Sequence, residues 1–178
     1  MYLISIYFDE KTEQAMQAYI NQIAKATGNS FMLDGSIPPH ITLLGFQAKD
    51  ESKVIELLDK HIDEIMSGYI YFAAIGEFKG QVIYAHPILN EYLSKLFEQV
   101  YNIYKENNDI TFSKFYIPNN WIPHMSIGKH LDEEQIIEAF KVLVKQFVPM
   151  EATVARIGIA KTNPHRDIKI YDLKRYEQ

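Results

Sequence analysis

The 178-residue chain contains no cysteine. It therefore has no disulfide framework, no thiolate zinc site and no cysteine nucleophile. No apolar run approaches the roughly 20 residues that a membrane-spanning helix needs. The first five residues also lack the basic start of a signal peptide. These absences favour a cytoplasmic protein that does not associate with a membrane.

Positive charge is also scarce. The sequence has 18 Lys and Arg residues against 23 Asp and Glu residues, which gives a formal net charge of −5. A protein that wraps a long nucleic acid relies on many Lys and Arg contacts to phosphates, so binding of a long duplex is not expected. A small pocket for a single phosphate remains compatible with this charge.

The composition is otherwise that of a globular domain. Hydrophobic residues make up 47% of the chain and charged residues 23%, and a chain of this size buries roughly 70% of its unfolded surface. The 12 Tyr and ten Phe residues supply aromatic faces for a core or for stacking on bases. We therefore expect a core that is stable without disulfide or metal crosslinks.

One short pattern occurs twice. Residues 39–45 read Pro-His-Ile-Thr-Leu-Leu-Gly, and residues 123–129 read Pro-His-Met-Ser-Ile-Gly-Lys. Alternate side chains of an extended strand share a face, so His40 is predicted beside Thr42, and His124 beside Ser126. Two such strands facing each other would form a pocket with two imidazoles and two hydroxyls.

The hydrophobic pattern around both motifs repeats one order: strand, helix, His strand, helix, strand. The first half is predicted as strand 2–8, helix 11–26, short strand 31–33, strand 40–46, helix 51–66 and strand 69–78. The second half is predicted as strand 82–85, helix 89–106, extended segment 111–117, the His124 strand, helix 132–147 and strands 153–160 and 168–173.

This order predicts an α+β fold in a single bilobal domain spanning residues 1–178. Lobe one covers about 1–78 and lobe two about 79–178, with exchange of strands between the lobes allowed. Each pseudo-symmetric lobe is expected to be a small, mostly antiparallel sheet with outer helices. A pseudo-two-fold axis between the lobes would place His40 and His124 on opposite walls of a central groove.

Two imidazoles suit displacement at phosphorus, because histidine titrates near pH ~6.5 and serves as base or acid at neutral pH. One imidazole would accept a proton from the attacking water and the other would donate one to the departing oxygen; each such transfer is typically worth ~10²–10⁴ in rate. The hydroxyls of Thr42 and Ser126 would donate hydrogen bonds to the non-bridging phosphoryl oxygens. The pattern leaves open which of His40 and His124 is the base.

The tetrads His-Ile-Thr-Leu at 40–43 and His-Met-Ser-Ile at 124–127, with the duplicated order, resemble the two-histidine (2H) phosphoesterase superfamily. That superfamily includes bacterial 2'-5' RNA ligases and RNA 2',3'-cyclic phosphodiesterases, and the resemblance covers essentially the whole chain. It implies two lobes with the motifs facing across a groove, His40 and His124 as the acid–base pair, and Thr42 and Ser126 holding the phosphate. It also implies activity without a metal on cyclic phosphates or 2',5'-linked nucleotides. Ser126 and Ile127 depart from the usual Thr and Leu.

Four further residues are candidates for substrate binding. Lys129 stands where the family often has a basic residue, but strict alternation points it away from His124 unless Gly128 bends the strand. Trp121, the single tryptophan, is a candidate for stacking on a base, with core packing as the alternative. Phe46 and Tyr116 are candidates for the pocket walls, again with core packing as the alternative.

The sequence therefore predicts a monomeric phosphoesterase without metal or other cofactor. Its expected partner is a small RNA end or nucleotide with a 2',3'-cyclic phosphate or a 2',5' linkage, and the reverse reaction would be 2'-5' ligation. The sequence contains no His-Glu-x-x-His pattern, which would indicate a zinc site, and no Gly-rich phosphate loop, which would indicate a nucleotide-dependent ligase. Two alternatives stay open: a non-catalytic module that binds RNA ends or nucleotides, and a structural domain whose repeated motif is a remnant of duplication.

Overall fold

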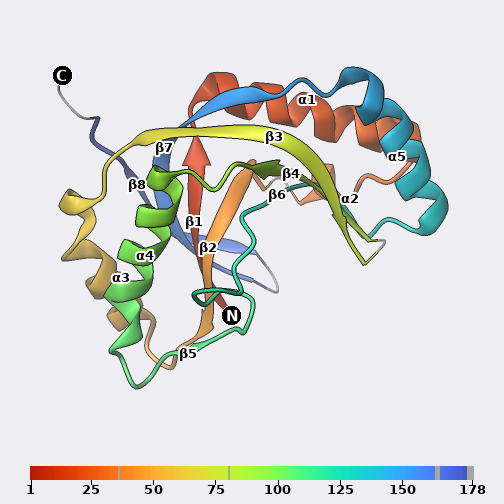
Figure 1. Cartoon of the computed structure of the whole chain (residues 1–178). Helices are drawn as coiled ribbons and strands as arrows, with labels where there is room; N and C mark the ends of the chain where they lie inside the picture. Colours follow the sequence, from red (N-terminus) through yellow and green to blue (C-terminus); the bar gives the residue numbers. More distant parts are fainter. Residues whose placement is uncertain (36, 80, 163–164, 176–178) are drawn as a thin grey trace.

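The computed structural model describes residues 1–35, 37–79, 81–162 and 165–175. The α+β class is confirmed (Figure 1). The described strands are β1 (Tyr2–Phe8), β2 (His40–Gln47), β3 (Gly68–Phe78), β4 (Val82–Pro87), β5 (Thr111–Phe112), β6 (Met125–Lys129), β7 (Met150–Lys161) and β8 (Arg166–Asp172). The described helices are α1 (Glu10–Thr27), α2 (Phe31–Asp34), α3 (Glu51–Asp59), α4 (Glu91–Lys105) and α5 (Glu133–Gln146), with a 3-10 turn at Ile62–Glu64. None of these helices has the length and apolarity to cross a membrane.

The strands form one continuous antiparallel sheet where the sequence predicts two small ones. The order is β5-β2-β1-β7-β3-β4-β6, and β8 pairs with β7. Strand β7 joins the two parts, because residues 154–161 pair with β1 and residues 150–154 pair with β3. Strands from the two halves of the sequence also mix, since β3 pairs with β4, and β5 pairs with β2. A cut between residues 78 and 79 therefore separates strands that belong to the same sheet.

The helices cross between the halves in the same way. Helix α1 packs on α5 and β6, whereas α4 packs on β2, β3 and α3. Figure 1 accordingly shows α1 and α5 together on one side and α3 and α4 on the other. The four longer helices, α1, α3, α4 and α5, each bury part of one face: in α4 the buried side chains are Leu93, Leu96, Phe97, Val100 and Tyr104. Full burial of such a side chain stabilises the fold by about 1.5–3 kcal/mol.

Helix ends follow from local side chains. Asp9 accepts a hydrogen bond from the Thr12 backbone N–H at the start of α1, and Gly28 ends the helix in the left-handed conformation at φ 69°. Asp132 and Gln135 form a capping box at α5. These caps set the helix boundaries close to the predicted ones.

Two predicted extended segments are wrong. Residues 31–34 form helix α2, because the carbonyl of Ser30 accepts hydrogen bonds from the N–H groups of Leu33 and Asp34. Only Thr111–Phe112 of the predicted segment 111–117 is strand. After it the chain turns, with the Tyr116 N–H donating to the Ser113 carbonyl, and continues as a loop to His124. Local hydrogen bonds have replaced strand pairing in both places.

The two His strands meet by curvature of the sheet. Strands β2 and β6 lie toward opposite ends of the strand order, yet they contact each other although the described residues show no pairing between them. The sheet must therefore bend until these strands face each other, and the long β3 is visibly bent in Figure 1. This curvature creates the space for a site between them.

Candidate active site

A cavity of about 560 Å³ lies between β2 and β6. Its walls include His40, Thr42, His124, Ser126 and Lys129. The remaining lining residues come from the start of β1, from the α2 segment, from the facing ends of β3 and β4, from the β5–β6 loop and from the residue after β7. The structure thus brings both imidazoles and both hydroxyls of the repeated motif into one cavity.

Both imidazoles are anchored in the same way. His40 Nδ1 donates a hydrogen bond to the Pro38 carbonyl at 2.9 Å, and His124 Nδ1 donates to the Ile122 carbonyl at 2.8 Å. A carbonyl oxygen can only accept, so Nδ1 carries the proton in each neutral ring. In both cases Nε2 is the nitrogen left to exchange a proton with a bound molecule.

A β-bulge interrupts each motif at the same place. Ser5 pairs with Thr42 but Ile4 pairs with Leu44, so the intervening Leu43 is an extra residue in β2. In β6 the pairs are Tyr84 with Ser126 and Ile83 with Gly128, so the extra residue is Ile127. Each bulge therefore falls on the fourth residue of its tetrad and reverses the alternation of side chains beyond it.

The second bulge decides the position of Lys129. Strict alternation from His124 would send Lys129 to the opposite face, whereas the extra residue turns it back toward the cavity. Lys129 pairs with Val82, which also lines the cavity. The bulge at Ile127, where the sequence suggested a bend at Gly128, places a positive charge beside the imidazoles.

The first bulge decides the position of Phe46, and the prediction that Phe46 lines the pocket is wrong. Alternation from His40 would bring it to the cavity, but the extra Leu43 turns it into the core, where it is fully buried. It stacks on Tyr2 with ring centroids 6.1 Å apart and also contacts Tyr104. Gly45 lies on the other face of β2, against Tyr116 and Leu3, which line the cavity.

Tyr116 lines the cavity as predicted from the sequence. Its ring lies against Gly45, where an added Cβ would come within 2.8 Å of Tyr116 Cδ2. Burial raises the pKa of the Tyr116 hydroxyl. Gly45 thus makes room for an aromatic wall that comes from a distant part of the chain.

Trp121 packs behind the cavity. Its ring stacks on Phe97 of α4 with centroids 4.4 Å apart and planes at 8°. Its indole N–H donates to the Thr42 carbonyl at 2.9 Å. The packing alternative therefore describes Trp121, and the residue fixes the backbone of one motif from behind.

The two hydroxyls have different neighbours. Thr42 is 8% exposed, and its Oγ1 lies 3.3 Å from Ser5 Oγ. Ser126 of β6 pairs with Tyr84 of the neighbouring strand β4. Because Ser5 can donate to Thr42, the single hydroxyl proton of Thr42 is available to a ligand.

The environment of both imidazoles favours their neutral forms. Burial is the largest cause that lowers the pKa of His40, while the hydrogen bond to Pro38 opposes it. Electrostatic interactions with His165, Lys129 and His124 lower the pKa of His40 further. Burial also lowers the pKa of His124, and positive charge on Lys129 and His86 acts in the same direction. Lys129 therefore interacts with both imidazoles.

Several residues around the site escaped the sequence reasoning. The His124 ring meets Phe78 edge-on at 4.9 Å and Tyr84 at 5.6 Å, while the His40 ring lies 6.0 Å from that of Tyr7. Phe78 also lines the cavity. The alternation of residues 82, 84 and 86 in β4 was the available signal. These residues share one face of the strand, and Val82 and Tyr84 pair with Lys129 and Ser126 of the second motif.

His86 supports the second motif from the neighbouring strand. Its Nδ1 donates to the Pro123 carbonyl at 2.9 Å, so it holds the peptide group between Pro123 and His124. His86 was not among the residues predicted for the site; it lies just after the predicted strand 82–85 and inside β4 of the structure. Within the described ranges, no cluster of three or more His, Cys, Asp or Glu side chains could hold a metal ion.

Comparison with known folds gives similar structures over nearly the full length. Escherichia coli LigT complexed with 3'-AMP superposes with a TM-score of 0.63 at 10% identity, covering 98% of each chain. TT0787 of Thermus thermophilus gives a TM-score of 0.64 at 13% identity, covering 99% of each chain. A protein described as a phosphoesterase gives 0.62 at 14% identity, with 98% of each chain covered. At these identities the likeness establishes the fold.

Comparison with curated protein sequences found no match. The model of the 2'-5' RNA ligase superfamily matches residues 12–166, which include both His motifs and most of the chain. The resemblance read from the two tetrads is confirmed by this match. The chain therefore belongs to the 2'-5' RNA ligase superfamily, a superfamily of two-histidine phosphoesterases and ligases.

Proposed function

We propose that this protein is a monomeric, metal-independent phosphoesterase in which His40 and His124 act as a general acid–base pair. Its proposed substrates are 2',3'-cyclic phosphates or 2',5' linkages at the ends of small RNAs or nucleotides. One observation carries the proposal. Two imidazoles, each anchored through Nδ1 to a carbonyl two residues upstream, line one cavity together with two hydroxyls and Lys129.

Hydrolysis of a cyclic phosphate needs a proton transfer on each side of phosphorus. One imidazole accepts a proton from water as the water oxygen attacks, and the other donates a proton to the ribose oxygen as its bond to phosphorus breaks. The two rings come from opposite ends of the sheet, which supports in-line displacement between them. Run backwards, the same transfers join a cyclic end to a hydroxyl and form a 2',5' bond.

The hydroxyls and Lys129 suit the charge that develops on the phosphoryl oxygens. Thr42 and Ser126 each offer one O–H to a non-bridging oxygen, in a site where burial strengthens such interactions. Lys129 adds a compact positive charge beside both imidazoles. The bound anion also raises the pKa of both rings, so that one of them holds the proton that the leaving oxygen needs.

The size of the cavity supports a nucleotide as the bound unit. About 560 Å³ is within the range of small-molecule sites. LigT has been crystallised with 3'-AMP, with ATP, with NADP+ and with phosphate. We extend this nucleotide chemistry to the present chain on the basis of its cavity and its family.

The test is turnover of nucleoside 2',3'-cyclic phosphates, with a chelator present, by wild type, His40→Ala and His124→Ala. Each substitution should lower kcat by ~10²–10⁴. His61→Ala is the matched control, because His61 lies at a helix end with 42% of its side chain exposed and pairs with Glu64. Circular dichroism and thermal unfolding check that each variant is folded.

Full activity in either folded variant would refute the assignment. Loss of wild-type turnover in the chelator would contradict metal independence. Tight binding of cyclic nucleotides by a wild-type protein that never turns them over would favour the non-catalytic binding module.

A further inference from the structure

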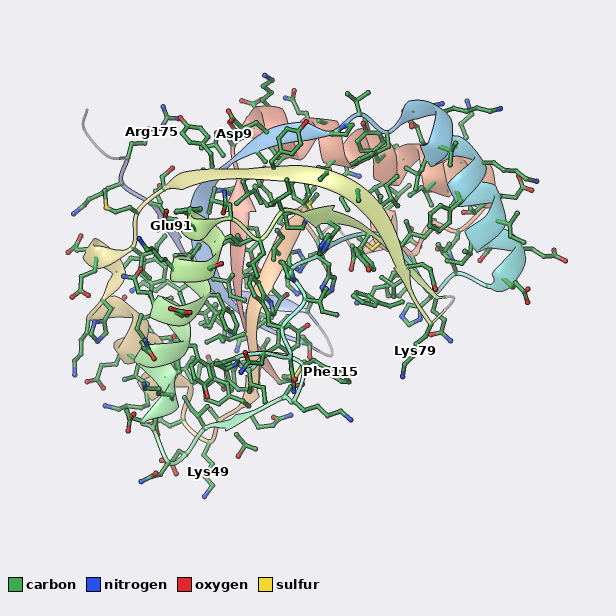
Figure 2. All side chains as sticks on the ribbon, in the orientation of Figure 1. Asp9, Lys49, Lys79, Glu91, Phe115 and Arg175 are labelled. Carbon is green, nitrogen blue, oxygen red and sulfur yellow. The ribbon has the colours of Figure 1, made fainter. Side chains whose placement is uncertain are left out.

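A second, smaller hollow lies on the loop between β5 and β6. It has a volume of about 360 Å³ and is lined by Lys114, Phe115, Asn119, Asn120, Trp121 and Ile122. Phe115 is 60% exposed and is labelled in Figure 2. The Lys114 ammonium lies 5.1 Å from the centre of the Phe115 ring. An open aromatic face beside a cation and amide groups is the combination that single-stranded nucleic acid binds.

The loop that carries this hollow is held in place at several points. Asn120 Nδ2 donates to the Lys114 carbonyl at 3.1 Å, which closes the loop on itself. The Trp121 ring forms part of the floor, fixed by its stacking on Phe97 and its hydrogen bond to Thr42. At the other end, the Ser113 N–H donates to the Gly45 carbonyl at 2.8 Å. The hollow is therefore formed before any ligand arrives, which lowers the entropy lost on binding.

The same loop also forms part of the catalytic cavity. Tyr116 lines that cavity, and its neighbour Phe115 lines the hollow. Ile122 lines the hollow with its side chain, and its carbonyl accepts the hydrogen bond that orients His124. Consecutive residues of one loop therefore line the two hollows, which is the basis for asking whether one RNA chain contacts both.

We propose that this hollow binds the nucleotide on the 5' side of the terminal one, so that the preferred substrate is a short single-stranded RNA end. The penultimate base would stack on Phe115, and Lys114 would meet the phosphate that joins the two nucleotides. Asn119 and Asn120 offer amide donors and acceptors to the base edge or ribose. This inference rests on the proposed function, because it assumes that the terminal cyclic phosphate occupies the catalytic cavity.

The charge of the protein agrees with a short ligand. The net charge of −5 opposes binding of a long strand by many phosphate contacts. The hollow offers one lysine and one strongly exposed ring, Phe115, because the Trp121 ring is already stacked on Phe97, and this matches one additional nucleotide. We therefore expect the gain from RNA length to be complete after one or two nucleotides beyond the terminal one.

The experiment compares kcat/KM for a nucleoside 2',3'-cyclic phosphate with kcat/KM for a trinucleotide that ends in the same cyclic nucleotide. Wild type should prefer the trinucleotide. Loss of a base–aromatic stack typically weakens binding about 5- to 150-fold, so Phe115→Ala should lower the trinucleotide-to-mononucleotide ratio by about tenfold. Lys114→Gln should lower the ratio less, and the loss should shrink at high salt.

Matched controls come from elsewhere on the surface. Tyr69 is 59% exposed on β3, and Lys145 is exposed on α5. Tyr69→Ala and Lys145→Gln should keep the wild-type ratio. A wild-type ratio near one, or a Phe115→Ala variant that loses both activities equally, would overturn the subsite.

Binding separates this inference from the proposed function. The trinucleotide is titrated into the His40→Ala, His124→Ala double variant with and without Phe115→Ala. Weaker binding caused by Phe115→Ala supports the subsite, and equal binding overturns it. Absence of wild-type turnover on both substrates would refute the proposed function without changing this binding result.

Discussion

Replacing Thr42 by valine removes one hydroxyl from the catalytic cavity and keeps the branched shape of the side chain. If the Thr42 hydroxyl donates to a phosphoryl oxygen in the transition state, kcat should fall by about 10²–10³, which corresponds to about 2.7–4 kcal/mol. The full effect is expected because Thr42 is only 8% exposed, so water cannot replace the lost donor. KM should change much less than kcat, since the hydrogen bond strengthens as charge develops.

The substitution also has a predictable effect on stability. Thr42 Oγ1 lies 3.3 Å from Ser5 Oγ, and Ser5 is 1% exposed, so valine leaves a buried hydroxyl without this partner. The expected cost is about 1–3 kcal/mol of unfolding free energy. Denaturant unfolding measures this term separately from steady-state hydrolysis of a nucleoside 2',3'-cyclic phosphate.

Ser5→Ala is the matched control. It breaks the same Ser5–Thr42 contact but leaves the Thr42 hydroxyl in the cavity. We expect a decrease of a few-fold in kcat, because Ser5 orients the hydroxyl and does not itself line the cavity. A Thr42→Val enzyme with kcat within about threefold of wild type, or a Ser5→Ala enzyme as impaired as Thr42→Val, would refute the reasoning.

Three further predictions concern the surroundings of the imidazoles. Lys129→Met should move the optimum of kcat/KM to higher pH, because the lysine charge lowers the pKa of both imidazoles and both pKa values should rise without it. An unchanged pH profile would show that the Lys129 charge does not affect the imidazoles. His86→Ala should lower kcat several-fold by freeing the Pro123 carbonyl, whereas His86→Asn, which keeps a donor near the Nδ1 position, should restore most of it; equal kinetics for the two variants would contradict a positioning role. Gly45→Ala should destabilise the fold by about 1–3 kcal/mol and weaken substrate binding, because its Cβ would meet the ring of Tyr116 at 2.8 Å; thermal unfolding and KM measure the two effects.

Most of the correct predictions about the site came from the repeated motif. A period of two in a strand is enough to put His40 beside Thr42 and His124 beside Ser126. Asp9 and Asp132 lie at or next to the predicted starts of their helices, and both cap the helix because their side chains accept from local N–H groups. These signals depend on neighbours in the sequence, so they are visible without tertiary structure.

The side chains placed wrongly or left open within the two motifs are those for which strand pairing overrides the local pattern. A bulge changes the face of every later side chain in its strand, and nothing in the alternation of residues 40–46 or 124–129 announces the extra residue. For this reason Phe46 was predicted to line the cavity although it lies in the core, and the face on which Lys129 lies could not be predicted. The pairing of β5 with β2 depends on contacts that are distant in the sequence in the same way, whereas β3 pairs with β4 as a local hairpin that crosses the predicted lobe boundary.

The course of β7 has a consequence for the tuning of the reaction. Val154 is the residue at which β7 stops pairing with β3 and begins pairing with β1, and the register of β1 against β7 shifts there. Val154 is fully buried and does not line the cavity, so we expect the separation of β2 and β6 to depend partly on packing at a residue outside the site. If His40 and His124 act as proposed, changes in side-chain packing around Val154 would alter the distance between the two imidazoles while leaving both imidazoles, both hydroxyls and Lys129 in place.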